Sequence, residues 1–464
     1  MGRIRTSRRA ILAAGLGGLA WAGGASAQTN APRAQTNVRL RADRLPPIVF
    51  VHDNGDTAAL WHTTMWRFES NGYPRRLLYA IDYAWPSARS DDGVAQPGRS
   101  STADQRAELA AYVKRVLQET RRRKVVLIGS SRGGNSIRNF LKNGGGAELC
   151  SHAILGGATN HGVLVSTEVL KNSEFNGAAP FLRLLNEGPT ETVPGVSFLT
   201  LRSDKLDKFA QPDGLFLGMA GKPTGLSYDA PELKGATNVV LPGLDHREVA
   251  FHKLAFQQMF RFIVGEEATS TFIAPEREVT LTGRVTGFAE GVYSNIAVAG
   301  ATVEIWAVDA STGERRTTAP LLRTTTPADG VWGPFRTTPE AWLEFVVTTP
   351  GNPVTHIYRS PFLRSSDIVH LRPGRFGKDD EKAGSVVYLS RPRGYFGHGR
   401  DKVLVDGKPA PGIPEHLVPS VSTSRLVYEP GPARAVLTAF NNETIPVRTW
   451  PAKDNHLVIA EFHA

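Results

Sequence analysis

Hydrophobic positions in the first half of the chain alternate between short apolar runs and longer amphipathic stretches. The apolar runs predict buried strands at 47–51, 77–83, 125–128, 151–155, 196–201 and 238–241. Between them, apolar residues recur at the helical period, for example at Leu109, Tyr112, Val113, Val116 and Leu117. Strand–helix alternation over residues 47–266 predicts a mostly parallel sheet with helices on both faces.

The pattern changes near Gly265. From about residue 275, β-branched and polar residues alternate, as in 301–306 and 342–347, and Gly, Pro and Asp mark the turns. We predict an all-β region over 275–464, either as one unit or as two, 275–373 and 383–464.

Two local features of the first half are the predicted start of a helix and an insertion between two strands. Thr102 and Gln105 have the spacing of a capping box and predict the start of a helix. The segment 163–195 is an apolar insertion between two strands. It fits a lid or cap over the sheet and also fits a plain surface excursion.

The N-terminus has the features of an export signal. Residues 7–12 (SRRAIL) are close to the twin-arginine pattern, and 25–27 (ASA) form an A-x-A cleavage site. We expect a signal peptide at 1–27, a polar linker at 28–46 and a periplasmic or extracellular mature chain; an uncleaved N-terminal anchor is the alternative. No later stretch is long enough to cross a bilayer.

Composition supports a soluble globular protein of two or three domains. The chain has 464 residues, of which 41% are hydrophobic and 21% charged. Its only cysteine, Cys150, excludes an intramolecular disulfide. Four charges of the net +10 come from arginines in residues 1–27, and the remaining basic residues are scattered, which gives no sign of a nucleic-acid groove. The histidines lack metal-ligand spacing, so we expect neither a metal nor a cofactor.

The strongest chemical signal is Gly129-Ser130-Ser131-Arg132-Gly133, which fits G-x-S-x-G. An apolar strand precedes it and a helical apolar stripe follows, which is the context of a nucleophile elbow. A serine in such a turn stands exposed above the sheet. Ser131 is therefore the candidate nucleophile.

This region resembles the secreted bacterial lipases and esterases of the α/β-hydrolase fold. The resemblance covers roughly 46–266 and is carried by 51–56 (VHDNGD), 129–134 (GSSRGG), 202–212 and 243–246 (GLDH). An α/β-hydrolase domain followed by a β domain is also similar in architecture to a small group of prokaryotic lipases.

The resemblance implies the remaining catalytic residues, because the fold orders its triad Ser, acid, His along the chain. His246 lies between the last predicted strand and the final helix, with His252 as the alternative. For the acid we favour Asp207 over Asp204, with Asp213 third.

An oxyanion hole needs backbone N–H donors. Arg132, which follows the nucleophile, supplies one, and by the family match Asn54 supplies the other. The chain departs from the family at Asp53, where glycine is usual. A carboxylate there opposes a developing negative charge unless it points away or is paired.

We therefore expect an exported serine esterase or lipase that acts through an acyl-enzyme on ester or lipid-like substrates. One alternative is a polyester depolymerase with exposed aromatic residues as a platform, at Trp306, Trp332, Trp342, Tyr395 and Phe396. Another is a binding protein with a degenerate hydrolase domain and a working β region. An amidase or peptidase would use the same triad.

Overall fold

The computed structural model describes residues 40, 41 and 43–464. The predicted signal peptide, 1–27, and most of the predicted linker, 28–46, lie outside the described residues.

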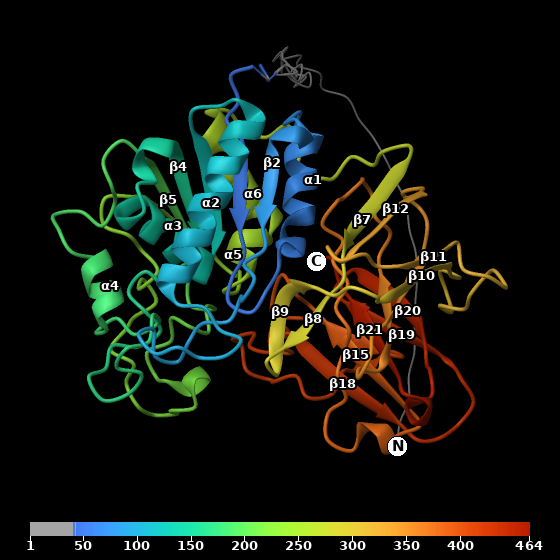
Figure 1. Cartoon of the computed structure of the whole chain (residues 1–464). Helices are drawn as coiled ribbons and strands as arrows, with labels where there is room; N and C mark the ends of the chain where they lie inside the picture. Colours follow the sequence, from blue (N-terminus) through green and yellow to red (C-terminus); the bar gives the residue numbers. More distant parts are fainter. Residues whose placement is uncertain (1–39, 42) are drawn as a thin grey trace, which may run out of the picture. The chain divides into compact units, whose positions relative to one another are not determined.

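A six-stranded parallel sheet forms the centre of the first half (Figure 1). Its spatial order is β2-β1-β3-β4-β5-β6, and every neighbouring pair is parallel. The strands are β1 Ile48–Val51, β2 Leu78–Ile81, β3 Val125–Ser130, β4 Cys150–Gly156, β5 Ser197–Arg202 and β6 Thr237–Val240. β2 is added on one side of β1, and β3 to β6 are added on the other side. The carboxyl ends of β1 and β3 therefore flank the switch in strand order, where α/β folds bind ligands.

Helices cover both faces of this sheet, because successive residues of a strand point to opposite sides. Val126 and Ile128 of β3 pack with the helices α1, α5 and α6, whereas Val125 and Leu127 pack with α2 and α3. The helices are α1 His62–Ser70, α2 Thr102–Thr120, α3 Arg132–Asn143, α4 Pro180–Leu185, α5 Glu248–Phe251 and α6 Lys253–Val264. The prediction of a parallel sheet between two helical layers is confirmed.

The capping box of α2 begins one residue earlier than predicted. Ser101 Oγ accepts the Asp104 N–H at 3.1 Å, and the Asp104 carboxylate accepts the Ser101 N–H at 2.8 Å. The Thr102 hydroxyl donates instead to Asp92, and Gln105 is buried. The box predicted from Thr102 and Gln105 is therefore wrong. The reason is that an aspartate, Asp104, takes the N3 position, where a capping box usually has Glu or Gln.

The insertion 163–195 contains one short helix, α4, and otherwise irregular chain. Its loop is tied internally by Asn176, whose amide donates to the carbonyls of Ser166, Val169 and Leu170. Val165 N–H donates to the Thr224 carbonyl at 2.7 Å, which fastens the insertion to the segment that follows β5.

The second half is built from β-sheets, as predicted. A seven-stranded sheet has the order β11-β10-β13-β14-β21-β15-β18, so strands from both sides of 374–382 share it. Most of its pairs are antiparallel, but β21 runs parallel to both β14 and β15. The strands of this half are β7 Val279–Arg284, β8 Thr286–Ala289, β9 Val292–Ala297, β10 Thr302–Ala307, β11 Leu322–Thr325, β12 Val331–Thr337, β13 Leu343–Thr348, β14 Val354–Arg359, β15 Ser385–Ser390, β16 Val403–Val405, β17 Lys408–Pro409, β18 Thr423–Tyr428, β19 Ala435–Phe440, β20 Glu443–Arg448 and β21 His456–Glu461.

The aromatic residues considered as a polymer platform are not exposed. Trp306, Trp332, Tyr395 and Phe396 are buried, and Trp342 is half-buried against a core. Their apolar area stabilises the β region from within, so the expectation of a platform from these residues is wrong.

The two halves share core and polar contacts. Trp66 of α1 is buried among β-region residues, and its indole N–H donates to the Ser365 carbonyl at 3.0 Å. His370 Nε2 lies 2.7 Å from Asp82 Oδ2, just beyond β2. In the described part of the chain, no helix is both long and apolar enough to cross a membrane.

Candidate active site

Ser131 lies in a sharp turn between β3 and α3. Its backbone has φ 50° and ψ −118°, a conformation that costs energy for a residue with a side chain. The glycines beside it permit this close turn. A Cβ on Gly133 would come within 2.6 Å of the His52 carbonyl oxygen, and one on Gly129 within 2.7 Å of Gly133. The G-x-S-x-G spacing therefore reflects backbone packed directly against backbone.

The three side chains predicted to act together form a hydrogen-bonded series. His246 Nε2 lies 2.9 Å from Ser131 Oγ, and His246 Nδ1 lies 2.9 Å from Asp207 Oδ2. All three residues are buried, and the Phe209 ring meets the imidazole edge to face with its centroid 4.7 Å away. The arrangement allows the imidazole to accept the serine proton while the carboxylate holds the other nitrogen.

The acid is held by its own loop. Asp207 Oδ1 accepts the Phe209 N–H at 2.8 Å, and the Gln211 amide donates to the Asp207 carbonyl at 2.7 Å. The other candidates lie elsewhere: Asp204 accepts the N–H groups of Lys205 and Gly243, and Asp213 accepts that of Leu215. His252, the alternative base, caps the N-terminus of α6.

Asn54 lies in the loop after β1, and the last residue of that strand, Val51, pairs with Gly129 of β3. Asn54 is exposed, and its side-chain oxygen accepts the Ala88 N–H at 2.8 Å. Its own N–H donates to no group in the part of the chain that the structure describes. The Arg132 N–H is the first of α3 and has no acceptor within the helix. Neither predicted oxyanion donor thus has an acceptor among the described residues, and the use of both by a substrate stays a prediction.

Asp53 is accommodated without positive φ and is paired. The side chain is buried, and Oδ2 lies 3.3 Å from Arg247 Nε. Burial raises the pKa of Asp53 well above its ordinary value, and the negative charge of neighbouring Asp56 adds to the rise. Burial opposes ionisation of Asp56 too, but Arg247 and a hydrogen bond from Asp53 keep the pKa of Asp56 below its ordinary value. Burial therefore favours the neutral form of Asp53, whereas Arg247 favours the charged form of Asp56.

The side chain of Arg132 has a role that the sequence did not indicate. Its guanidinium is fully buried and donates to Glu174 Oε1 at 2.9 and 2.5 Å and to the Ser100 carbonyl at 2.8 Å. Glu174 belongs to the insertion 163–195. The residue after the nucleophile therefore anchors that insertion to the elbow.

A network of ion pairs holds the residues next to His246 in the chain. Arg391, from the segment after β15, donates to Asp245 Oδ2 at 3.2 Å and also to Glu248, and Arg400 donates to the same two carboxylates. Burial and the Glu248 charge raise the pKa of Asp245 to about 6. Although burial opposes it, the two arginines lower the pKa of Glu248 to about 2. The β region thereby fixes the residue that precedes His246.

Within the described residues, no group of three or more His, Cys, Asp or Glu side chains is arranged to hold a metal ion.

Family models of two domains match the chain. Residues 45–170 match the model of class 2 lipases, and residues 277–376 match that of the lipase C-terminal domain. These two matches support a lipase family with a C-terminal domain for this chain. The class 2 match contains Ser131 and the loop of Asn54, and the second match lies in the β region.

Solved structures similar to this chain include lipases. The mature lipase BlEst2 of Bacillus licheniformis has 21% sequence identity and a TM-score of 0.35, over 47% of this chain and 92% of that one. Its propeptide form has 16% identity and a TM-score of 0.36, over 87% and 92%. Lipase B of Aspergillus fumigatus has 14% identity and a TM-score of 0.36, over 49% and 54%. No curated protein matches the sequence.

Proposed function

We propose that this chain is a serine hydrolase that cleaves carboxylic esters through an acyl-enzyme. The observation that carries the proposal is the series Ser131–His246–Asp207, with two contacts of 2.9 Å, at the end of the elbow strand. A serine hydroxyl needs an adjacent base to act as a nucleophile, and the base needs a carboxylate to orient it.

In the proposed reaction, Ser131 Oγ attacks the ester carbonyl while His246 Nε2 takes the serine proton. The backbone N–H groups of Asn54 and Arg132 stabilise the oxyanion, and Asp207 stabilises the imidazolium. The imidazolium then gives its proton to the leaving alcohol. Water activated by His246 attacks the acyl-enzyme and releases the carboxylic acid.

Apolar esters are the substrates that the surroundings favour. Val165, Val169 and Leu170 of the insertion are each more than two-fifths exposed. The insertion is hydrogen bonded to Thr224, whose hydroxyl donates to the Gln211 carbonyl in the acid loop. Exposed aliphatic side chains thus lie on a segment tied to the acid loop, where an apolar substrate would bury them.

Two further parts of the proposal concern export of the chain and cleavage of polyesters. We propose export by the twin-arginine route, which rests on the motif at 7–12 and the A-x-A site at 25–27. Cleavage of polyesters is less well supported, because the aromatic residues considered for polymer binding are buried or half-buried.

The test is hydrolysis of chromogenic esters of increasing acyl length by the full chain and by two serine variants. Ser131→Ala should lower kcat by about 10⁴-fold or more, because the nucleophile is lost. Ser130→Ala is the matched control, since Ser130 is a buried neighbour in β3 and its hydroxyl has no hydrogen-bond partner in the described residues. Turnover that survives Ser131→Ala would refute Ser131 as the nucleophile. No turnover of any ester by the unmodified chain would favour the binding-protein alternative.

A further inference from the structure

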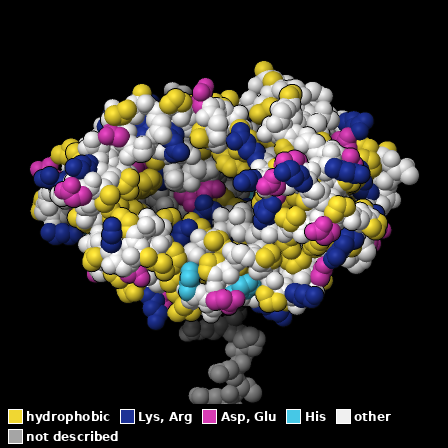
Figure 2. Space-filling view, turned by 90° about the horizontal axis from the view of Figure 1, so that it is seen from below, with side chains coloured by type: hydrophobic (Ala, Val, Ile, Leu, Met, Phe, Trp, Pro, Cys, Tyr) yellow, Lys and Arg dark blue, Asp and Glu magenta, His cyan; other side chains and the backbone are white. Residues whose placement is uncertain are grey.

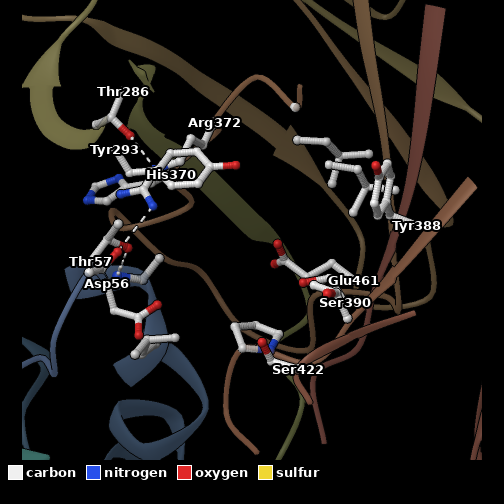
Figure 3. Close-up of a pocket in the computed structure, with 18 of the residues that line it drawn as sticks. Asp56, Thr57, Thr286, Tyr293, His370, Arg372, Tyr388, Ser390, Ser422 and Glu461 are labelled. Carbon is white, nitrogen blue, oxygen red and sulfur yellow. Dashed lines mark hydrogen bonds between the residues drawn. The ribbon is translucent and has the colours of Figure 1, made fainter. Parts of the chain in front are cut away.

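A cavity of about 470 Å³ lies between the loop after β1 and the sheets of the β region (Figure 3). Gly55, Asp56 and Arg247 line one side, whereas Ser131, His246 and Asp207 do not line it. Its volume is that of a small-molecule site. Seen from below, the surface of the molecule is hollowed near its centre, with acidic and basic side chains inside the hollow (Figure 2).

Positive charge predominates in the lining of this cavity. Its carboxylates, Asp56 and Glu461, are paired with Arg247 and Arg359 at 2.5 and 2.7 Å. Arg372, Arg375 and Arg393 also line it, and none of these three has a carboxylate within ion-pair distance among the described residues. An unneutralised charge in a partly buried position is costly, so an anion would stabilise this arrangement.

Arg372 is the arginine best placed to bind such an anion. The guanidinium lies over the Tyr293 ring, 4.7 Å from its centroid, and donates to Asn295 Oδ1 at 2.8 Å. Its other two hydrogen bonds, to the Gly55 carbonyl and the Thr286 hydroxyl, are long at 3.4 and 3.5 Å and therefore weak. Figure 3 shows Arg372, Tyr293 and Thr286 together on one side of the cavity.

The other two arginines have different positions. Arg393 is buried, and its guanidinium donates to the carbonyls of Ala59 and Leu60, so that in this cavity wall it contributes charge more than free hydrogen-bond donors. Arg375 is exposed and lies 3.4 Å from the centre of the Phe288 ring. A ligand that reaches Arg372 thus meets positive charge from more than one direction.

The remaining wall combines hydroxyl groups with apolar side chains. Ser390 and Ser422 lie on the side opposite Arg372 (Figure 3), and Ile357, Leu457 and Ile459 add aliphatic surface from β14 and β21. A simple inorganic anion would leave this apolar part unused. We propose that the cavity is a binding site for an organic anion, a carboxylate or phosphate monoester attached to an apolar body.

Calorimetric titration of the full chain tests this proposal without reference to turnover. The probes are octanoate, octyl phosphate, octanol and inorganic phosphate, all below micelle-forming concentrations. Octanoate, octyl phosphate or both should bind, whereas octanol should bind at least about tenfold more weakly because it lacks the charge. Octanol binding as tightly as the anions, or inorganic phosphate binding as tightly as octyl phosphate, would overturn the proposal.

The proposed active site could also hold an organic acid. Variants of cavity residues show in which of the two sites the anion binds. Arg372→Met should weaken binding of the anion about tenfold or more. Arg375→Gln, at an exposed position, should weaken it as well and guards against misfolding of the first variant. Arg336→Met, on exposed β12 surface outside the cavity, is the control and should leave affinity unchanged. Unchanged affinity in both cavity variants would place the anion elsewhere and refute the site.

Discussion

At the scale of single residues, the acid loop shows how two similar aspartates acquire different roles. Asp207 is buried and reaches the imidazole, while its second oxygen is occupied by the Phe209 N–H. Asp204, three residues earlier, is only partly buried and accepts backbone N–H groups of turns. Only Asp207 can fix the tautomer of His246.

Asparagine at each position distinguishes these roles. Asp207→Asn should lower kcat for a chromogenic ester by about 10⁴-fold, since an amide keeps the shape but cannot stabilise the imidazolium. Asp204→Asn should leave kcat almost unchanged. Steady-state kinetics of both variants checks this, and an equal loss in both would show that the hydrogen-bonded series is not the catalytic one.

The sequence predicted Ser131, His246 and Asp207 because each follows the end of a strand, where position alone limits the candidates. It did not reveal the partners of Arg132, Asp53 and Asp245. Glu174 is 42 residues from Arg132, and Arg391 is 146 residues from Asp245. Such pairs depend on tertiary contacts, and a single sequence carries no periodic signal for them.

At the scale of elements, the start of α6 depends on a histidine. His252 is the N-cap residue, and its Nδ1 accepts the Leu254 N–H at 3.3 Å, which requires that nitrogen to be unprotonated. Burial lowers the pKa of His252 to about 4. The folded protein therefore keeps the accepting form over a wider pH range than the unfolded chain does.

This cap makes part of the stability depend on pH. Because the folded pKa of His252 lies below its ordinary value of 6.5, the stabilisation is complete above about pH 6.5 and is lost as the pH falls towards about 4. His252→Asn caps without titrating in that range. The melting temperature of the unmodified chain should therefore fall relative to that of the variant between these pH values. A constant difference would mean that the cap does not titrate.

Element prediction succeeded where periodicity was strong and failed where the direction of side chains mattered. The six strands of the first sheet lie where apolar runs predicted them. In the β region, alternation distinguishes two faces but does not say which face meets a core, so Trp332 and Phe396 were wrongly considered for the surface.

At the scale of the whole molecule, the β region binds the residues on either side of the proposed catalytic histidine. Arg391 is buried and binds both Asp245 and Glu248, on either side of His246 and Arg247. Since the loop before α5 has no strand pairing of its own, this contact fixes its position. Arg391 is thus a positioning residue for the base.

Arg391→Met should lower both stability and kcat. Removing one partner of a buried ion network costs about 3–5 kcal/mol, and displacement of His246 should lower kcat roughly tenfold to a hundredfold with little change in KM. Arg448→Met removes an exposed pair with Glu314 and should cost at most about 1 kcal/mol. Thermal unfolding and steady-state kinetics give the comparison; a variant with normal kcat and melting temperature would remove Arg391 from this role.

The position of β21 in the seven-stranded sheet affects how the protein is made. β21 comprises residues 456–461, yet it pairs with β14 on one side and β15 on the other. While the ribosome is still adding the preceding hundred or so residues, both neighbours have an unpaired edge that can join another nascent chain. Proteolysis between β20 and β21, or premature release of the chain, would leave the same two edges open. The presence of β21 therefore decides whether the edges of β14 and β15 are covered or open to aggregation.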